Sequence, residues 1–349
     1  MSHINGFIGY PIFICEIQAG WGEKMIEVEA LSKSFKVAKR GAGVGAALKS
    51  LFKPDYSRVQ ALENISFKID ESQIVGYIGP NGAGKSTTIK IISGILVPDS
   101  GKCNILGNTP WKNRIKHVKN IGVVFGQRSQ LWWDVPVIDS YNLLKDIYKI
   151  PDKDFKNNLE LLTSTLDLSG LLTTPVRQLS LGQRMRCEIA ASLLHSPKIL
   201  FLDEPTIGLD AVSKIAVRNF IKTINKEKKV TVILTTHDMN DIEALADRII
   251  LIGKGRLLLD GNLTDLKNKY VTHKTLTVYF AENHEDIDIE GTTILSKSRE
   301  RLSLSVDLNK IKVSEVIGLL SNKLDIIDVS VDSRPIEEII VDLYKEYQI

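Results

Sequence analysis

The chain has 349 residues, of which 43% are hydrophobic and 25% are charged, and its formal net charge is +3. This composition is ordinary for a globular protein, and the length allows a main domain and a smaller one. The small net charge, without a basic and aromatic patch, gives no reason to expect a nucleic-acid partner. The three cysteines, Cys15, Cys103 and Cys187, have neither metal-binding nor disulfide spacing, which indicates a reducing, cytosolic setting.

No segment approaches the roughly 20 uninterrupted apolar residues that a membrane-spanning helix needs. Residues 7–17 come nearest, but a glycine, a proline and a glutamate interrupt them, and no positively charged region precedes them as in a signal peptide. An alternating pattern that is typical of a first strand begins at Met25. We therefore interpret residues 1–24 as an upstream extension or as the product of a misassigned start.

From Met25 onward, strand-like and helix-like segments alternate, which predicts an α/β fold with a mostly parallel sheet. The first two predicted strands form an antiparallel β layer, and Gly253, Gly255 and Gly261 mark the turns of a closing hairpin. The predicted strands are 26–30, 61–69, 74–78, 121–125, 199–202, 230–235 and 248–252, and the predicted helices are 86–95, 141–148, 155–166, 184–194, 214–225 and 241–246.

A basic insertion, residues 36–58, interrupts the predicted pair of strands at 26–30 and 61–69. Its early glycines predict a flexible start, and residues 46–52 could form a short helix. Its side chains could contact acidic lipid head groups or a neighbouring subunit, but charge runs are usually solvated surface, which is the interpretation we favour. The basic residues are Lys36, Lys39, Arg40, Lys49, Lys53 and Arg58, against Asp55 alone.

The tail forms a second predicted unit, a small α/β domain without an obvious catalytic cluster. We expect it to be an interaction or regulatory module rather than a second active site. Its predicted strands are 275–280, 301–308 and 326–331, and its predicted helices are 311–320 and 336–347.

A phosphate-binding loop is predicted between the strand at 74–78 and the helix at 86–95, where the residues match G-x-x-x-x-G-K-[ST]. The glycines allow the backbone to approach an anion, and the helix N-terminus adds a partial positive charge. Lys85 can reach the β- and γ-phosphates, and the Ser86 hydroxyl can bind Mg²⁺. The residues predicted to bind a nucleoside triphosphate are Gly79, Pro80, Asn81, Gly82, Ala83, Gly84, Lys85, Ser86 and Thr87.

Two carboxylates follow the apolar strand at 199–202. Beside a phosphate loop, Asp203 would hold Mg²⁺ directly or through water. Glu204 can project towards the γ-phosphate and act as the general base for the attacking water. An Asp-Glu pair alone would indicate only a polar strand end, so the prediction depends on its pairing with the loop.

A second anion site is predicted at residues 179–183, Leu-Ser-Leu-Gly-Gln, which precede a strongly helical stretch. Ser180 suits a helix N-cap, and Gly182 permits close backbone approach. Because the phosphate loop already binds its own phosphates, a second anion site indicates a second molecule.

Gln127 and His237 each follow a predicted strand. The Gln127 carboxamide can bind Mg²⁺ or the attacking water, and a neutral His237 can bond the γ-phosphate and position the water. Either residue by itself would carry no functional meaning.

Together these motifs resemble the nucleotide-binding subunit of an ABC transporter. The phosphate loop, Gln127, residues 179–183, residues 199–204, Gly208-Leu209-Asp210 and His237 occur in the family's order. The resemblance covers about residues 26–267. It implies a P-loop NTPase of the ABC cassette fold, with a mixed sheet core, an antiparallel β subdomain and a helical subdomain at about 128–192, plus the small C-terminal α/β domain. The implied domains are an extension at 1–24, a cassette at 25–265 and an accessory domain at 266–349.

The resemblance also implies a head-to-tail dimer in which two ATP molecules are sandwiched. Each lies between the phosphate loop of one subunit and Ser180, Gly182 and Gln183 of the other. In this scheme Asp210 communicates across the dimer and Phe35 stacks on adenine. The implied catalytic residues are Glu204, His237 and Gln127, and the implied Mg²⁺ ligands are Ser86, Gln127 and Asp203.

Two positions depart from the family's usual pattern. Leu181 replaces the first glycine of L-S-G-G-Q, but Ser180 and Gly182, which face the phosphate, remain. The adenine-stacking residue is more often tyrosine than phenylalanine. The basic insertion directly follows Phe35.

Residues 128–144 lie where the family contacts its membrane partner, and they include Trp132, Trp133 and Tyr141. Adjacent tryptophans suit an interface with one apolar side, although core packing within a helical subdomain is an equal alternative. The run at 126–134, with the basic insertion and the tail, is similar to the ATPases of ABC-2-type exporters.

These observations predict an ATPase that powers separate integral membrane permease subunits, together with a second cassette, at the cytoplasmic face of the membrane. We expect export. An importer ATPase shares every catalytic motif and remains an alternative. A soluble ABC protein that acts on ribosomes or DNA is disfavoured, because the chain has one cassette and no heptad run.

Overall fold

The computed structural model describes residues 24–38, 56–126, 128–281 and 287–348. The chain forms two compact units that divide after Gly261, rather than at the predicted boundary near 265. All but Lys24 of the predicted extension lies outside the described residues, as do residues 39–55 of the basic insertion, with its predicted helix.

The first unit is built on a six-stranded sheet in the order β5-β6-β7-β3-β8-β9. Its strands are β3 Ile74–Ile78, β5 Ile121–Phe125, β6 Ile199–Asp203, β7 Thr231–Thr235, β8 Arg248–Gly253 and β9 Arg256–Asn262. Neighbouring strands from β5 to β8 are parallel, and β9 returns beside β8 after a tight turn at Lys254 and Gly255. Every residue of β3 and β7 is buried, as expected for strands covered on both faces. Because parallel strands end at one edge, the segments after β3, β5, β6 and β7 meet there.

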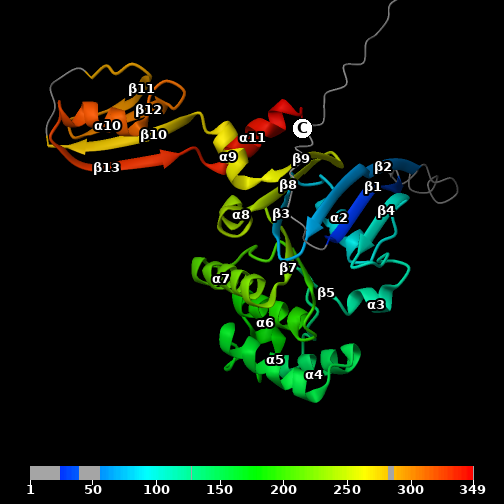
Figure 1. Cartoon of the computed structure of the whole chain (residues 1–349). Helices are drawn as coiled ribbons and strands as arrows, with labels where there is room; N and C mark the ends of the chain where they lie inside the picture. Colours follow the sequence, from blue (N-terminus) through cyan, green and yellow to red (C-terminus); the bar gives the residue numbers. More distant parts are fainter. Residues whose placement is uncertain (1–23, 39–55, 127, 282–286, 349) are drawn as a thin grey trace, which may run out of the picture. The chain divides into compact units, whose positions relative to one another are not determined.

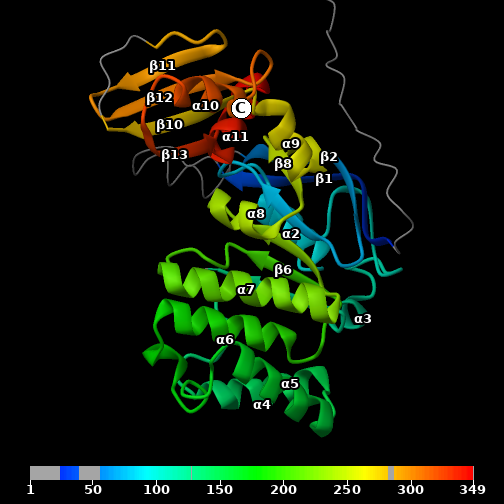
Figure 2. The same cartoon turned by 60° about the vertical axis from the view of Figure 1, so that its left-hand side comes forward.

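Helices cover this sheet, and several form a helical layer beside it (Figure 1). They are α2 Lys85–Ile92, α3 Arg114–Val118, α4 Val137–Tyr148, α5 Asp152–Thr165, the 3₁₀ turn η1 Val176–Gln178, α6 Leu181–Leu193, α7 Ala211–Lys228 and α8 Met239–Leu245. In Figure 2, α7, α6, α5 and α4 follow one another away from the sheet. Ser180 and Asp210 cap α6 and α7 with their side chains, which explains why these helices begin where they do.

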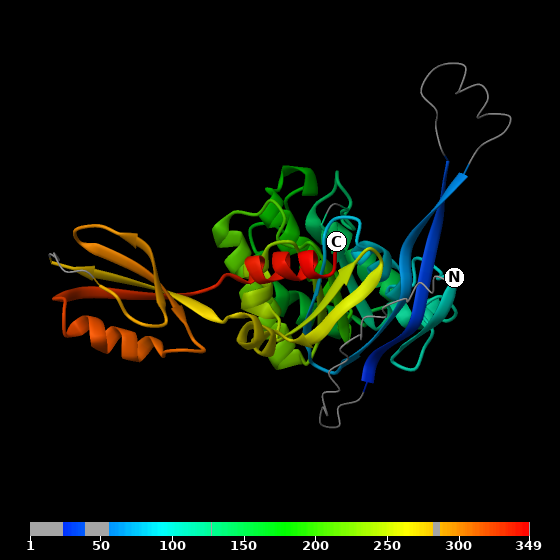
Figure 3. The same ribbon diagram turned by 90° about the horizontal axis from the view of Figure 1, so that it is seen from above.

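A three-stranded antiparallel sheet in the order β2-β1-β4 forms a further layer of this unit. Its strands are β1 Lys24–Ala38, β2 Tyr56–Asp70 and β4 Ser100–Ile105. The predicted interruption at 36–58 is wrong at both described ends, because Lys36 still pairs with Arg58. Its ends extend β1 and β2, which form the long ribbon in Figure 3. β4 was not predicted because only Cys103 and Ile105 of its residues are buried, too few to produce an alternating pattern.

One apolar core joins the two sheets, with α2 between them. It includes Ile26 of β1, Ile65 of β2, Ile89 of α2 and Phe201 of β6, all fully or almost fully buried. The phosphate loop therefore connects β3 and α2, which both contribute buried residues to this core.

The second unit is a four-stranded antiparallel sheet in the order β11-β12-β10-β13, with helices. Val316 and Leu320 of α10 pack against Leu276, Val278 and Leu304 of the sheet. The helix α9 and the strand β11 were not predicted. Among the described residues, no helix is both long and apolar enough to cross a membrane. The elements are α9 Leu263–Tyr270, β10 His273–Phe280, β11 Thr292–Lys297, β12 Arg301–Asp307, α10 Val313–Ser321, β13 Ile326–Ser333 and α11 Ile336–Glu346.

Candidate active site

The phosphate loop follows β3 and leads into α2. Gly84 has a φ of 108°, and a Cβ at this position would lie 2.6 Å from the Ala61 carbonyl oxygen. A Cβ on Gly79 would lie 2.3 Å from the Ile252 carbonyl oxygen. These glycines are required because the loop is enclosed between β2 and β8, not only because a phosphate must approach it.

Lys85 is only 7% exposed and donates hydrogen bonds to the carbonyl oxygens of Gly79, at 2.7 Å, and Pro80, at 3.1 Å. Burial lowers the pKa of its ammonium group, while the negative charges of Glu204 and Asp203 act in the opposite direction. The ends of β3 and β6 therefore meet around one cation, as a site for phosphate and metal requires.

Asp203 presents one carboxylate oxygen for a ligand. Its other oxygen accepts a hydrogen bond of 2.5 Å from the Thr235 hydroxyl at the end of β7. Within the described part of the chain, the remaining Asp203 oxygen and the Ser86 hydroxyl have no hydrogen-bond partner. The helix that carries Ser86 packs against β6. Carboxylate and hydroxyl oxygens are ligands that Mg²⁺ prefers, so these residues fit the ion.

The third predicted Mg²⁺ ligand, Gln127, lies outside the described residues. No group of three or more His, Cys, Asp and Glu side chains forms a metal cluster in the described ranges. A site completed by waters and substrate phosphates needs no such cluster, because Mg²⁺ keeps several of its waters.

Glu204 and His237 are in direct contact. The Nδ1 atom of His237 lies 3.1 Å from Oε1 of Glu204, and His237 is the more exposed of the two side chains. The Glu204 backbone has a φ of 57°, a left-handed conformation that is costly for a residue with a side chain. Its N–H group donates to the Thr235 carbonyl oxygen at 2.9 Å, which helps to hold that conformation.

Two residues of this site were missed in the sequence. Thr235 bonds both Asp203 and Glu204 from the adjacent strand. Gly126 donates its N–H group to the Asp203 carbonyl oxygen at 2.8 Å, and a Cβ there would lie 2.5 Å from the Glu204 carbonyl oxygen. Their positions in the sequence could have indicated them. Thr235 ends β7 and Gly126 follows β5, and these strands are the two neighbours of β6.

A buried carboxylate, Asp241, organises the same edge of the sheet and was also missed. Asp241 is fully buried and accepts hydrogen bonds from Arg218, at 2.6 Å, from Thr236, at 3.2 Å, and from Thr206. It thus connects the segment after Glu204, the segment before His237 and the helix α7. No sequence signal distinguishes it from an ordinary acidic residue near a helix start.

The second predicted anion site lies at the start of α6. Ser180 and Gln183 form a capping box: the Gln183 N–H donates to the Ser180 hydroxyl oxygen at 3.2 Å, and the Ser180 N–H donates to Oε1 of Gln183 at 2.9 Å. No hydrogen bond joins Ser180 or Gln183 to the phosphate loop within the described ranges. The hydrogen bonds of this capping box are therefore local to the start of α6.

Gly182 and Asp210 meet through Ser213. A Cβ on Gly182 would lie 2.4 Å from the Ser213 hydroxyl oxygen. That hydroxyl donates to one Asp210 oxygen at 2.9 Å, and the Ser213 N–H donates to the other at 2.8 Å. These bonds, led by the backbone one, lower the pKa of the Asp210 carboxyl. Leu181 lies against Gly208 but is still 36% exposed.

The predicted contact region contains two exposed tryptophans. Trp132 is 43% and Trp133 is 50% exposed, so the alternative in which they pack in a core is wrong, although Tyr141 is fully buried. The turn at Ser129 and Gln130, just before the tryptophans, is held by the buried Glu188 of α6. Glu188 accepts hydrogen bonds from the Ser129 hydroxyl and, at 3.1 Å, from the Gln130 N–H. Burial raises the pKa of the Glu188 carboxyl, while these bonds oppose the rise.

Phe35 lies in β1, where it pairs with Val59 of β2 and is 37% exposed. The Lys33 ammonium group is 5.7 Å from the centre of its ring. The neighbouring part of β2, at Ala61, touches the phosphate loop. The ribbon that carries Phe35 thus reaches the loop, while stacking on adenine stays a prediction.

Comparison with known proteins places these motifs in one family. The family model described as ABC transporter matches residues 62–207. "Methionine import ATP-binding protein MetN 2" of Enterococcus faecalis is 31% identical over 71% of this chain and 72% of its own length. The chain belongs to the ABC transporter ATP-binding family. Its cassette is therefore an ATPase of the ABC type, as predicted.

Other relatives of this ABC cassette are longer than the chain. "ABC transporter A family member 1" of Dictyostelium discoideum is 31% identical over 69% of the chain, which spans only 28% of that protein. "Probable multidrug ABC transporter ATP-binding protein YbhF" of Escherichia coli is 33% identical over 70% of the chain and 38% of its own length.

A solved structure, the dimeric post-hydrolysis state of an ATP-binding cassette bound to ADP and Pi, shares the fold of this ABC cassette. It has 26% identity and a TM-score of 0.57 over 68% of this chain and 99% of that one. The predicted cassette fold, with its mixed sheet, is confirmed.

Proposed function

We propose that this chain is the ATP-hydrolysing subunit of an ABC transporter that powers a separate membrane permease. The observation that carries the proposal is the convergence of Lys85, Asp203, Glu204 and His237 at the carboxyl edge of the parallel sheet. These groups supply a phosphate cradle, a metal ligand, a general base and a polar group beside the base.

Hydrolysis follows from these positions. ATP lies with its phosphates in the phosphate loop, where Lys85 exchanges its bonds with the Gly79 and Pro80 carbonyls for bonds to phosphate oxygens. Glu204 accepts a proton from the water that attacks the γ-phosphorus, the bond between that phosphorus and the β–γ bridging oxygen breaks, and ADP leaves. His237, which contacts the Glu204 carboxylate, orients it towards this water. Ser86, Asp203 and the predicted ligand Gln127 would hold Mg²⁺, which would neutralise charge on the phosphates.

We further propose a head-to-tail dimer with two sandwiched ATP molecules. Two features support it: Ser180, Gly182 and Gln183 form a helix N-terminus suited to an anion, and no hydrogen bond joins Ser180 or Gln183 to the phosphate loop within the described ranges. Gly182 lies against Ser213, and the Ser213 hydroxyl donates a hydrogen bond to Asp210. Through these contacts the start of α6 meets the segment that follows Glu204. Dimerisation of a similar cassette, bound to ADP and Pi, is named for a solved relative.

We propose that the permease partner binds the surface around Trp132 and Trp133 and that the subunit acts at the cytoplasmic face of the membrane. We propose export because the run at 126–134 is similar to the ATPases of ABC-2-type exporters. Relatives are named for multidrug transport and for methionine import, so import is the second candidate.

The decisive experiment is purification of the tagged full chain from detergent-solubilised membranes, with mass spectrometry of bound proteins. We expect a multi-span membrane protein, and a Trp132→Ser variant should recover about fivefold less of it, because an exposed interface aromatic contributes about 1 kcal/mol or more. The matched control is Leu319→Ser, at a similarly exposed leucine of α10, outside the predicted contact region at 128–144.

Reconstitution of chain and partner in vesicles then sets the direction. With the cassette outside, ATP-driven accumulation of cargo inside the vesicle indicates export, and loss of loaded cargo indicates import. Recovery of only ribosomal or DNA-bound material would contradict the transport proposal.

A further inference from the structure

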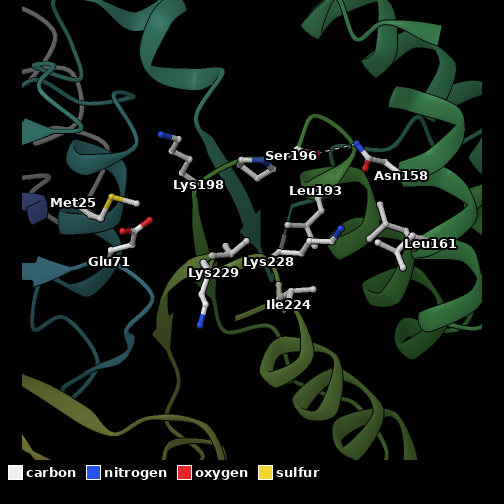
Figure 4. Close-up of a pocket in the computed structure, with 13 residues that line it drawn as sticks. Met25, Glu71, Asn158, Leu161, Leu193, Ser196, Lys198, Ile224, Lys228 and Lys229 are labelled. Atoms are coloured by element: carbon white, nitrogen blue, oxygen red, sulfur yellow. Dashed lines mark hydrogen bonds between the residues drawn. The ribbon is translucent and has the colours of Figure 1, made fainter. Parts of the chain in front are cut away.

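A cavity of about 270 Å³ opens at the amino-terminal ends of β6 and β7, the edge of the sheet opposite to the active site. In Figure 4, Leu161 of α5 faces Leu193 and Ile224, while Met25 and Glu71 stand on the other side. The nucleotide motifs contribute nothing to it, so it is unused by the proposed function. Its apolar lining includes Met25, Leu161, Leu162, Leu193, Ile224 and Val230.

A second hollow of about 450 Å³ adjoins this cavity and shares Asn158, Ser196 and Lys228 with it. Its lining is more polar than that of the first. Asn158 donates hydrogen bonds of 2.9 Å to the Leu194 carbonyl and the Ser196 hydroxyl oxygens, which fixes the boundary between the two spaces. An apolar space thus adjoins a polar one.

The lining is rich in unpaired positive charge. Five lysines line the two spaces against two acidic residues, Glu71 and Asp154. Within the described part of the chain, none of the five makes an ion pair. The helix dipole stabilises the positive charge of Lys228, which lies in the last turn of α7. No helix dipole stabilises the charge of Lys198, which directly precedes the strand β6. The lysines are Lys119, Lys149, Lys198, Lys228 and Lys229.

We propose that this cavity binds a small anionic amphiphile, an alkyl or acyl chain with a carboxylate or phosphate head group. The chain lies against Leu161, Leu193 and Ile224, and the head group lies at Lys228, where the two spaces join. The volume suits a small molecule rather than a protein segment, which would need a longer groove. The excess of unpaired lysines selects an anion over a cation.

Calorimetric titration of the full chain without nucleotide tests the proposal, with octanoate as the probe. Octanoate should bind saturably. Acetate lacks the tail and octan-1-ol lacks the charge, so both should bind at least about fivefold more weakly. From butanoate to octanoate, each CH₂ group that becomes buried should raise the affinity about fourfold.

Two variants with matched controls locate the site. Lys228→Glu should weaken octanoate binding about fivefold, whereas Lys226→Glu makes the same change in the same helical turn, outside the cavity, and should not. Leu161→Ser should weaken it about fourfold, whereas Leu143→Ser, at an equally exposed leucine of α4, should not.

Absence of saturable octanoate binding would overturn the proposal. It would also be overturned if octan-1-ol bound as tightly as octanoate. The same holds if Lys228→Glu and Leu161→Ser bound octanoate as tightly as the original chain. Because no nucleotide is present, any of these results would leave the proposed ATPase function untouched.

Discussion

At the scale of single residues, the active site depends on backbone positions that few side chains tolerate. Glu204 holds a left-handed conformation, and Gly126 passes too close to its carbonyl oxygen for any Cβ. The Asp203 carboxylate accepts a bond from the Thr235 hydroxyl, and the Glu204 N–H donates to the Thr235 carbonyl oxygen. The general base is thus fixed before substrate arrives, which reduces the cost of orienting it during catalysis.

Glu204→Gln should lower steady-state ATP turnover about 10²–10⁴-fold, because the amide cannot accept the proton of the attacking water. ATP binding, measured by equilibrium titration, should be retained, since the phosphate loop is unchanged. The control is Glu227→Gln, on the exposed side of α7 and away from the site. Near-normal turnover in Glu204→Gln would remove the base from this mechanism.

At the scale of elements, buried polar groups fix how the helical layer meets the sheet. Glu188 of α6 holds the turn at Ser129 and Gln130 after β5, and Gln130 returns a bond of 2.9 Å to the Glu188 carbonyl oxygen. His195, just after α6, donates from Nε2 to the Ile121 carbonyl oxygen of β5 at 3.0 Å and stacks on Tyr148. Both interactions couple α6 to β5, the strand that leads to Gln127.

Glu188→Ala should destabilise the chain by about 2 kcal/mol, because the Ser129 hydroxyl and the Gln130 N–H lose their buried partner. Chemical denaturation measures the loss, and hydrogen exchange at residues 129–131 should rise before global unfolding. Glu188→Gln keeps an acceptor and should lose less. Equal stability of the alanine variant would show that the turn is held by other contacts.

Lowering the pH should destabilise the fold through His195. Burial lowers its pKa to about 4, and its buried Nδ1 atom has no partner among the described residues, so a proton there would be unsatisfied. Between about 6.5 and 4 the unfolded chain binds more protons at this residue, so the free energy of unfolding falls as the pH falls, by about 1.4 kcal/mol per pH unit.

The measurement is urea denaturation of the chain and of His195→Gln across that range. Glutamine keeps an N–H donor for Ile121 and cannot titrate, so its slope should be shallower. Some slope will persist, because burial also lowers the pKa of His117. Identical slopes would show that His195 remains solvated.

At the scale of the whole molecule, the proposed catalytic unit is larger than one chain. In the proposed dimer, the phosphate loop and the Ser180 helix start would be complementary halves of a site, and no hydrogen bond joins Ser180 or Gln183 to the loop within the described residues. Closed two-fold dimers are the commonest way to complete such sites, because each interface then forms twice.

Mixing Lys85→Ala with Gly182→Glu tests this arrangement. Each variant alone should be inactive, because both sites of its homodimer are damaged. An equal mixture should recover about a quarter of the original turnover, since half of the dimers are mixed and each has one intact site. Melting curves and ATP binding by Gly182→Glu control for folding. A mixture that stays inactive although mixed dimers form would contradict the sandwich.

The sequence by itself determined the chemistry-bearing segments, because a phosphate loop and a strand-end carboxylate pair are local patterns set by backbone geometry. It also predicted the parallel sheet, since alternating strands and helices leave few other arrangements. It missed β4 and β11, whose residues are too polar or too exposed to alternate, and it placed an interruption where β1 and β2 continue to pair.

Only the tertiary structure decided which residues meet at the site. Thr235, Asp241 and Ser213 act through partners far away in sequence, and no local pattern encodes a contact made by packing. The same reason applies to the lysine-lined cavity, whose walls come from β1, α5, α6 and α7. The sequence of a segment determines its local conformation and its functional groups. Packing between segments determines which of these groups come into contact.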